Sequence, residues 1–185
     1  HVSYAWLSAW SFRHGEFPIW SNFFASGSPY LQFYGSLFFF LVGLTDLILE
    51  DVSLSIKWVL IGLHVFSGLG MYCFVRTLCG SRQAGFISGL AYVLCFWHTH
   101  QILIMGRLPL SAFYALLPWP FFFFERLRFP SRQIPAVIGG ALTLGALPFA
   151  HPGYAFWGTA LLTLYIGIRF LIARSTWPLK KLGKY

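Results

Sequence analysis

Long apolar segments alternate with short polar connections along most of the chain. A helix needs about 20 apolar residues to cross the hydrocarbon layer of a bilayer. Five segments reach or approach that length: 54–78, 84–105, 110–124, 134–150 and 154–173. The third is short, but Arg107 and Arg126 flank it, and long arginine side chains can reach the headgroups from inside the layer. The pattern predicts an all-α fold, namely a polytopic transmembrane bundle of about five helices within residues 54–174.

A further apolar stretch, residues 31–49, differs from these five because it contains Asp46 and is followed by Glu50 and Asp51. A carboxylate at the bilayer midplane costs about 2.5–3.5 kcal/mol on the insertion scale. We therefore expect 31–49 to be an interfacial or re-entrant helix in a long outer loop over residues 1–53. The opening residues, 1–30, are polar and aromatic and are expected to be loop. If 31–49 spanned instead, the whole N-terminal stretch would be cytoplasmic, and this alternative stays open.

Positive charge is concentrated in alternate connections, which predicts the orientation. The cytoplasmic side of a membrane protein collects Lys and Arg. Three connections carry nearly all of them: Arg76 with Arg82; Arg126, Arg128 and Arg132; and Arg174 followed by Lys180, Lys181 and Lys184. The last three lie in a cytoplasmic basic tail over 175–185. The outer side then receives residues 1–53 and two short turns, one at Gly106 and Arg107 and one at His151.

Composition excludes a soluble domain and makes the lipid bilayer the expected partner. Only 10% of the 185 residues are charged, whereas soluble domains have about 25%. The net charge of +8 would suggest nucleic acid in a soluble protein. Here the basic residues lie at the ends of apolar segments, so topology explains them better and no nucleic-acid partner is predicted. Because the chain opens at His1 in a loop-like stretch, we expect it to be a piece of a longer protein.

Two sets of small residues recur at helical spacing, Ser81, Gly85 and Gly89, then Ala141 and Gly145. Such spacing favours close approach of helices in a membrane.

The candidate chemistry lies in the outer turns. Arg107 occupies a short turn between two apolar segments, and a guanidinium fork matches phosphate oxygens. His151 opens a second short turn, and in a packed bundle both turns would face one outer cavity. Either residue could instead simply belong to a hydrated turn. No metal site is predicted, because His98 and His100 would point about 200° apart on a helix.

Several short motifs together resemble those of a known family. They are His1, the sequences GEFPIW at 15–20, GSPY at 27–30 and FYGSLFF at 33–39, then Lys57, His64, GLGMY at 68–72, RTLCGSR at 76–82, Gly106 with Arg107, Pro118 and His151. The pattern resembles the bacterial and archaeal membrane proteins labelled 6-pyruvoyl-tetrahydropterin-synthase-related, although nothing here resembles the soluble pterin enzyme. Those proteins are similar to the C-type (GT-C) membrane glycosyltransferases, which include protein mannosyltransferases and the aminoarabinose transferase of lipid A. The resemblance covers most of the chain.

The resemblance implies a function at the outer face of the plasma (inner) membrane of a prokaryote. A sugar would pass from a polyprenyl-phosphate donor to a lipid or surface glycan. The family's acidic catalytic residue lies near the start of its first outer loop, which here would precede His1, so Glu16 is the remaining catalytic candidate. Arg107, with His151, Arg13 and His1, would bind the substrate phosphate. No cofactor is assigned, and assistance by a divalent cation stays open.

Two other functions compete with this one. A transporter or flippase for a lipid-linked substrate would place ionisable residues and helix breaks near the midplane, where the sequence offers only His64. A non-catalytic subunit of a membrane complex would tolerate loss of Arg107 and His151.

Overall fold

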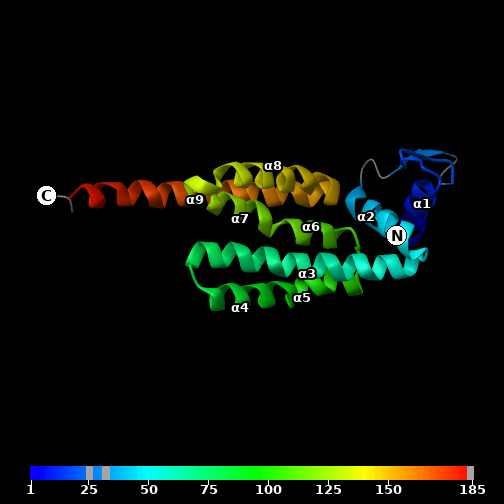
Figure 1. Ribbon diagram of the computed structural model, residues 1–185, viewed down its shortest axis with the longest axis horizontal. Helices are drawn as coiled ribbons and strands as arrows, with labels where there is room; N and C mark the ends of the chain where they lie inside the picture. Colours follow the sequence, from blue (N-terminus) through cyan, green and yellow to red (C-terminus); the bar gives the residue numbers. More distant parts are fainter. Residues whose placement is uncertain (24–26, 31–33, 183–185) are drawn as a thin grey trace.

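The chain folds into an elongated, mostly helical molecule (Figure 1). The computed structural model describes residues 1–23, 27–30 and 34–182, with side chains described as far as Ile172. In chain order the elements are α1 (Val2–Arg13), β1 (Trp20–Ser21), β2 (Ser28–Pro29), α2 (Ser36–Leu49), α3 (Val52–Cys79), α4 (Arg82–Val93), α5 (Phe96–Thr99), the π-helix η1 (His100–Ile104), α6 (Leu110–Leu116), α7 (Pro118–Arg126), the 3₁₀-helix η2 (Pro130–Arg132), α8 (Gln133–Ala150) and α9 (Pro152–Leu182). The strands β1 and β2 pair antiparallel.

Four helical stretches are long and apolar enough to cross a membrane: Val52–Cys79, Arg82–Ile104, Pro130–Ala150 and Pro152–Ile172. They lie along the long axis of the molecule (Figure 1). The arginine-rich α3–α4 and α7–α8 connections lie together on the side from which α9 extends toward the C-terminus. The other end holds α1, α2, the start of α6 and the α8–α9 turn. The helix α2 is apolar but shorter, and the opening residues 31–33 of the expected helix 31–49 lie outside the described residues.

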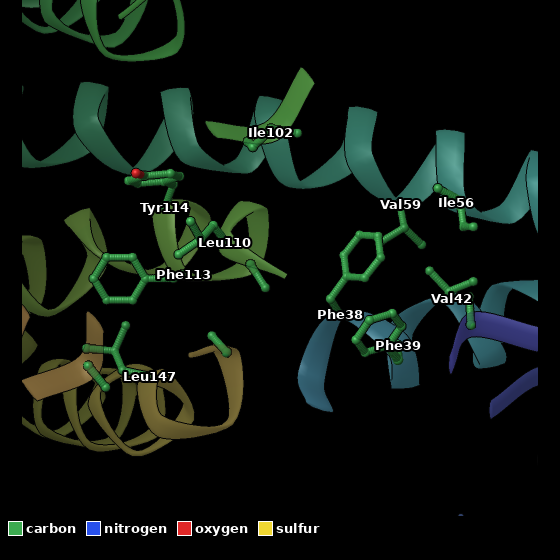
Figure 2. Close-up of a cluster of buried hydrophobic side chains, with 14 of the residues drawn as sticks. Phe38, Phe39, Val42, Ile56, Val59, Ile102, Leu110, Phe113, Tyr114 and Leu147 are labelled. Atoms are coloured by element: carbon green, nitrogen blue, oxygen red, sulfur yellow. The ribbon is translucent and has the colours of Figure 1, made fainter. Parts of the chain in front are cut away.

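The segment 110–124 is two short helices rather than the single helix that its apolar pattern predicts. The helix α7 begins at Pro118 and also contains Pro120, and proline removes a backbone donor and clashes with the preceding turn. The preceding helix α6 is buried along almost its whole length instead of facing outward. Leu110, Phe113 and Tyr114 point into the core (Figure 2). The prediction of one continuous helix here was wrong because the two prolines divide it.

Helix α1 corrects the expectation that residues 1–30 are loop. It packs against α2 so closely that a Cβ atom on Gly43 would lie 2.5 Å from Cδ2 of Phe12. Its buried positions are mostly small residues, Ala5, Leu7, Ser8, Ala9 and Ser11. A buried face made of alanine and serine produces no apolar stripe, and the sequence pattern therefore did not indicate a helix.

A two-residue turn fixes α2 against α3. Glu50 ends α2 in the left-handed conformation with φ of 53°, and the Asp51 side chain accepts a 2.9 Å hydrogen bond from the Leu54 amide to cap α3. Apolar side chains fill the angle between the two helices: Phe38, Phe39 and Val42 from α2, and Ile56 and Val59 from α3 (Figure 2). These contacts hold α2 against the first turns of α3.

Glycines set the close packing of α3 on α4. A Cβ atom on Gly85 would lie 2.9 Å from the Tyr72 carbonyl oxygen, and one on Gly89 would lie 2.9 Å from the Gly68 carbonyl oxygen. The prediction from small-residue spacing is confirmed for these two glycines. It was wrong for Gly145, where a Cβ would meet nothing within 4 Å.

Candidate functional site

Three connections that are distant in the sequence meet at the end of the bundle that holds α1 and α2. A Cβ atom on Gly35 would lie 1.9 Å from the Ala150 carbonyl oxygen and 3.2 Å from Cβ of Pro109. Only glycine permits this approach, because backbone atoms cannot move aside as a flexible side chain can. The segment before α2, the turn before α6 and the α8–α9 turn are thereby held together.

Two histidines contact one tyrosine at this junction. The ring centroid of Tyr34 is 5.7 Å from that of His1 and 6.0 Å from that of His151. The His151 ring also lies edge-on to Tyr154 at 4.9 Å, and its Nδ1 accepts a 3.4 Å hydrogen bond from the Tyr154 amide. An accepting Nδ1 indicates the neutral tautomer with the proton on Nε2.

Arg107 contributes a positive charge at the same junction. It follows Gly106, whose φ of 65° suits glycine, and its Nη1 donates a 3.0 Å hydrogen bond to Oε1 of the buried Gln101. This bond holds one edge of the guanidinium, while the side chain as a whole is exposed. A fixed, exposed guanidinium is a suitable partner for a phosphate.

The charge of Arg107 acts on both neighbouring rings. Burial lowers the pKa of His151, and the positive charge of Arg107 lowers it further. Burial also raises the pKa of Tyr34, and Arg107 partly offsets that rise. Near neutral pH the site therefore combines a permanent cation with a neutral imidazole.

An aromatic cleft of about 580 Å³ adjoins this group. That size is within the range of small-molecule pockets. It is lined by the N-terminal segment, α2 and the α8–α9 turn, through Phe17, Pro18, Ile19, Pro29, Tyr30, Tyr34, Ser36, Phe40, Pro148, Phe149 and Pro152. Tyr34 belongs both to the cleft and to the group with the two histidines, and it is close enough to Arg107 to feel its positive charge.

The structure brings together three of the four predicted substrate-binding residues, Arg107, His151 and His1, and separates the fourth. Arg13 is at the opposite end of α1 from His1, about 18 Å along the helix axis. Its Nη2 lies 2.6 Å from Oδ2 of Asp46, whose side chain is fully buried. Arg13 thus neutralises a buried carboxylate, and we leave it out of the site.

The predicted catalytic residue, Glu16, is exposed in the loop between α1 and β1. It directly precedes Phe17, which lines the cleft. The other four carboxylates of the chain are committed elsewhere or lie outside this segment: Asp46 pairs with Arg13, Glu50 and Asp51 form the α2–α3 turn, and Glu125 is buried in α7. Among the described residues, Glu16 is therefore the acid that adjoins the cleft lining in the chain, although its own side chain does not line the cleft.

The sequence reasoning missed a buried ion cluster around Glu125. The carboxylate lies 2.7 Å from Arg128 Nη2 and 3.0 Å from Arg169 Nε, and it accepts a 2.6 Å hydrogen bond from the Tyr165 hydroxyl. Two signals in the sequence pointed to it: Glu125 is an acid at the edge of an arginine-rich connection, and Arg169 lies inside an apolar segment. An ionisable residue within a spanning segment normally has a partner.

His98, in α5, lies against α3 within the bundle. Its ring lies 5.6 Å from that of His64, near the middle of α3, and its Nδ1 is 3.2 Å from the Tyr92 carbonyl oxygen. Over the part of the chain that the structure describes, no three His, Cys, Asp or Glu side chains are grouped so that they could hold a metal ion.

Comparison with known proteins found no family model, no curated protein and no solved structure that matches this chain.

Proposed function

We propose that this protein is a GT-C-like glycosyltransferase of a prokaryotic plasma membrane, acting on a polyprenyl-phosphate-linked sugar at the outer face. The observation that supports it most directly is the convergence of Arg107, His151 and His1 beside an aromatic cleft. Four membrane-length helices carry this group at one end, and the arginine-rich connections lie at the other. Under the positive-inside rule the site is then on the outer side and the N-terminal segment is a long outer loop with interfacial helices.

In the proposed reaction, an acceptor hydroxyl attacks the anomeric carbon of the donor sugar. The bond between that carbon and the phosphate oxygen breaks, its electron pair stays on the phosphate, and the polyprenyl phosphate leaves. A carboxylate, for which Glu16 is the candidate, takes the proton of the attacking hydroxyl. Arg107 stabilises the charge that develops on the phosphate. His151 and Tyr34, which feel the charge of Arg107, help to position the same group.

The first test is lipid-phosphate binding to the full-length protein in detergent. Arg107→Ala should weaken binding of a polyprenyl phosphate by at least about tenfold, because a hydrogen bond to a charged group contributes about 1.5–3 kcal/mol. Arg132→Ala is the matched control, since Arg132 is also exposed but lies at the opposite end of the bundle. Equal binding by the Arg107 variant and the wild type would remove the phosphate from this turn.

The catalytic part of the proposal has a separate test. With a radiolabelled polyprenyl-phosphate sugar and a membrane extract as acceptor source, Glu16→Gln should abolish transfer while leaving binding of the donor unchanged. Retained transfer would assign the base to another group, and transfer by neither protein together with normal binding would favour a non-catalytic role.

One observation favours a second candidate, a transporter or flippase for a lipid-linked substrate. The stretch Arg82–Ile104 is interrupted after Val93 and continues as α5 and the π-helix η1, and His98 meets His64 just beyond this break. Broken helices with ionisable residues at mid-depth are typical of transporters. The test measures whether the protein moves a fluorescent polyprenyl phosphate across the membrane of reconstituted vesicles. Translocation by the wild type that is lost in His64→Leu would support this function, and sugar transfer without translocation would exclude it.

A further inference from the structure

A narrow groove runs along the outside of α3. Two hollows, of about 490 Å³ and about 270 Å³, share His64 and Val65 and so meet at that turn of the helix. The larger lies between α3 and α4, and the smaller continues along α3 toward α5, η1 and the start of α6. Along α3 the lining extends from Leu60 to Tyr72, which is about 18 Å of helix.

The lining of the groove suits a single hydrocarbon chain. Its walls are mostly aliphatic and aromatic, and the polar rings of His64 and His98 are packed against each other at 60°. Gly68 and Gly89 line it where α3 and α4 approach most closely, and a Cβ on Gly68 would come within 2.9 Å of Val93 Cγ1. The close approach leaves a shallow channel between two helices rather than a broad face.

One end of the groove adjoins the turn that carries Arg107. The smaller hollow ends at Ile102, Leu103 and Ser111. Ser111 Oγ donates a 2.6 Å hydrogen bond to the Leu108 carbonyl, next to Arg107 in the chain. Gln101, which precedes Ile102, holds the Arg107 guanidinium. A lipid with its phosphate at Arg107 would therefore have the mouth of the groove beneath its headgroup.

We infer that this groove binds the isoprenoid chain of the lipid whose phosphate is held at Arg107. The inference rests on the proposed function, because the phosphate site defines where the chain begins. The two hollows form one course of about 18 Å along α3, which matches a single long chain better than the paired chains of a glycerophospholipid. The α3 face concerned belongs to a helix long enough to cross the bilayer, so the chain would remain in the hydrocarbon layer.

The test blocks the groove without touching the phosphate site. Leu69 lines the groove and is 51% exposed, and Leu161 on α9 is also 51% exposed but lies outside it. We expect Leu69→Trp to weaken binding of a long-chain polyprenyl phosphate by at least tenfold, and Leu161→Trp to leave it unchanged. Binding of a two-isoprene prenyl phosphate, too short to reach Leu69, should be the same in both variants and should still be lost in Arg107→Ala.

A second measurement uses the wild-type protein and does not depend on the folding of a variant. A long-chain polyprenyl phosphate with a photoreactive group in the part of the chain nearest the phosphate, which the groove is long enough to hold, should label peptides of α3 and α4, and not α9. Labelling spread over all lipid-facing helices, or wild-type affinity in a folded Leu69→Trp, would overturn the groove assignment while leaving Arg107 as the phosphate anchor. The groove assignment would also be overturned if phosphatidic acid competed equally well with the polyprenyl phosphate and its binding were weakened to the same extent by Leu69→Trp. The groove would then accept any lipid chain.

Discussion

The Tyr165 hydroxyl donates a 2.6 Å hydrogen bond to Oε1 of Glu125, a carboxylate that is completely buried between α7 and α9. The same carboxylate pairs with Arg169 of α9 and with Arg128, whose Nη2 also reaches the Thr77 carbonyl oxygen at 3.3 Å. One acid thus joins three helices at the end of the bundle opposite to the candidate site.

Loss of that acid should destabilise the fold without affecting lipid binding. Glu125→Ala leaves two guanidiniums without their counter-ion, and breaking a buried ion pair costs about 3–5 kcal/mol, with the lower end expected here because both arginines are partly exposed. Tyr165→Phe removes only one hydrogen bond and should cost less, about 1.5–3 kcal/mol. Thermal unfolding in detergent should rank the proteins as wild type, Tyr165→Phe, then Glu125→Ala. Equal unfolding temperatures would mean that the cluster is not a stabilising one.

A methyl group at Gly35 should disrupt the candidate site. The added Cβ overlaps the Ala150 carbonyl oxygen, so the segment before α2 must move away from the α8–α9 turn, at a cost of about 1–3 kcal/mol. We expect Gly35→Ala to lower both the unfolding temperature and the affinity for a polyprenyl phosphate. Gly62→Ala is the control, because a Cβ there meets nothing within 4 Å and alanine favours a helix over glycine by about 0.5–1 kcal/mol. A Gly35 variant with unchanged binding would show that the junction is not needed to form the site.

Arg13 and Arg107 should give opposite phenotypes. Arg13→Ala leaves Asp46 buried and unpaired, and should destabilise the protein by roughly 3 kcal/mol while lipid-phosphate affinity is unchanged. Arg107→Ala should reduce affinity with little effect on stability, because its side chain is exposed. The double variant Arg13→Ala, Asp46→Ala should recover part of the lost stability, and a double-mutant cycle gives the coupling. Loss of lipid binding in a stable Arg13 variant would return Arg13 to the site.

Acid should weaken the junction through His151. Its pKa is lowered in the folded state by burial and by Arg107, so the folded protein takes up a proton on this ring less readily than the unfolded chain does. The neutral His151 ring therefore contributes its full stabilisation of the fold above the ordinary histidine pKa of about 6.5. That stabilisation is lost as the pH falls through the lowered pKa of His151 in the folded state. The unfolding temperature should therefore drop between pH 7.5 and pH 5, and drop less in His151→Gln. The other groups facing this ring are Tyr34, Arg107 and Tyr154. His1 stacks on Tyr34, so His1→Asn is measured in parallel. An identical drop in His151→Gln would assign the acid sensitivity to another group.

Sequence patterns anticipated the helical bundle and the meeting of the Arg107 and His151 turns, because both follow from the alternation of long apolar segments with short connections. They did not anticipate α1, whose buried face is too small and polar to produce a hydrophobic period. Glu125 was missed because its neighbouring arginines were read as topology signals alone. The roles of Arg13 and Tyr34 depend on contacts between segments far apart in the chain, which periodicity does not encode.

The short joint between α2 and α3 bears on how a substrate reaches the site. Only Glu50 and Asp51 connect the two helices, and Asp51 also caps α3. The phenylalanines of α2 pack against α3, so the position of α2 relative to α3 is fixed. The helix α2, with α1 packed on it, is therefore held directly against α3 rather than joined to it by a long linker. For a membrane-embedded substrate, the natural approach to Arg107 is then sideways, from within the bilayer and between the helices. Arrival by that route needs no opening step, so the supply of substrate would depend on diffusion in the plane of the membrane.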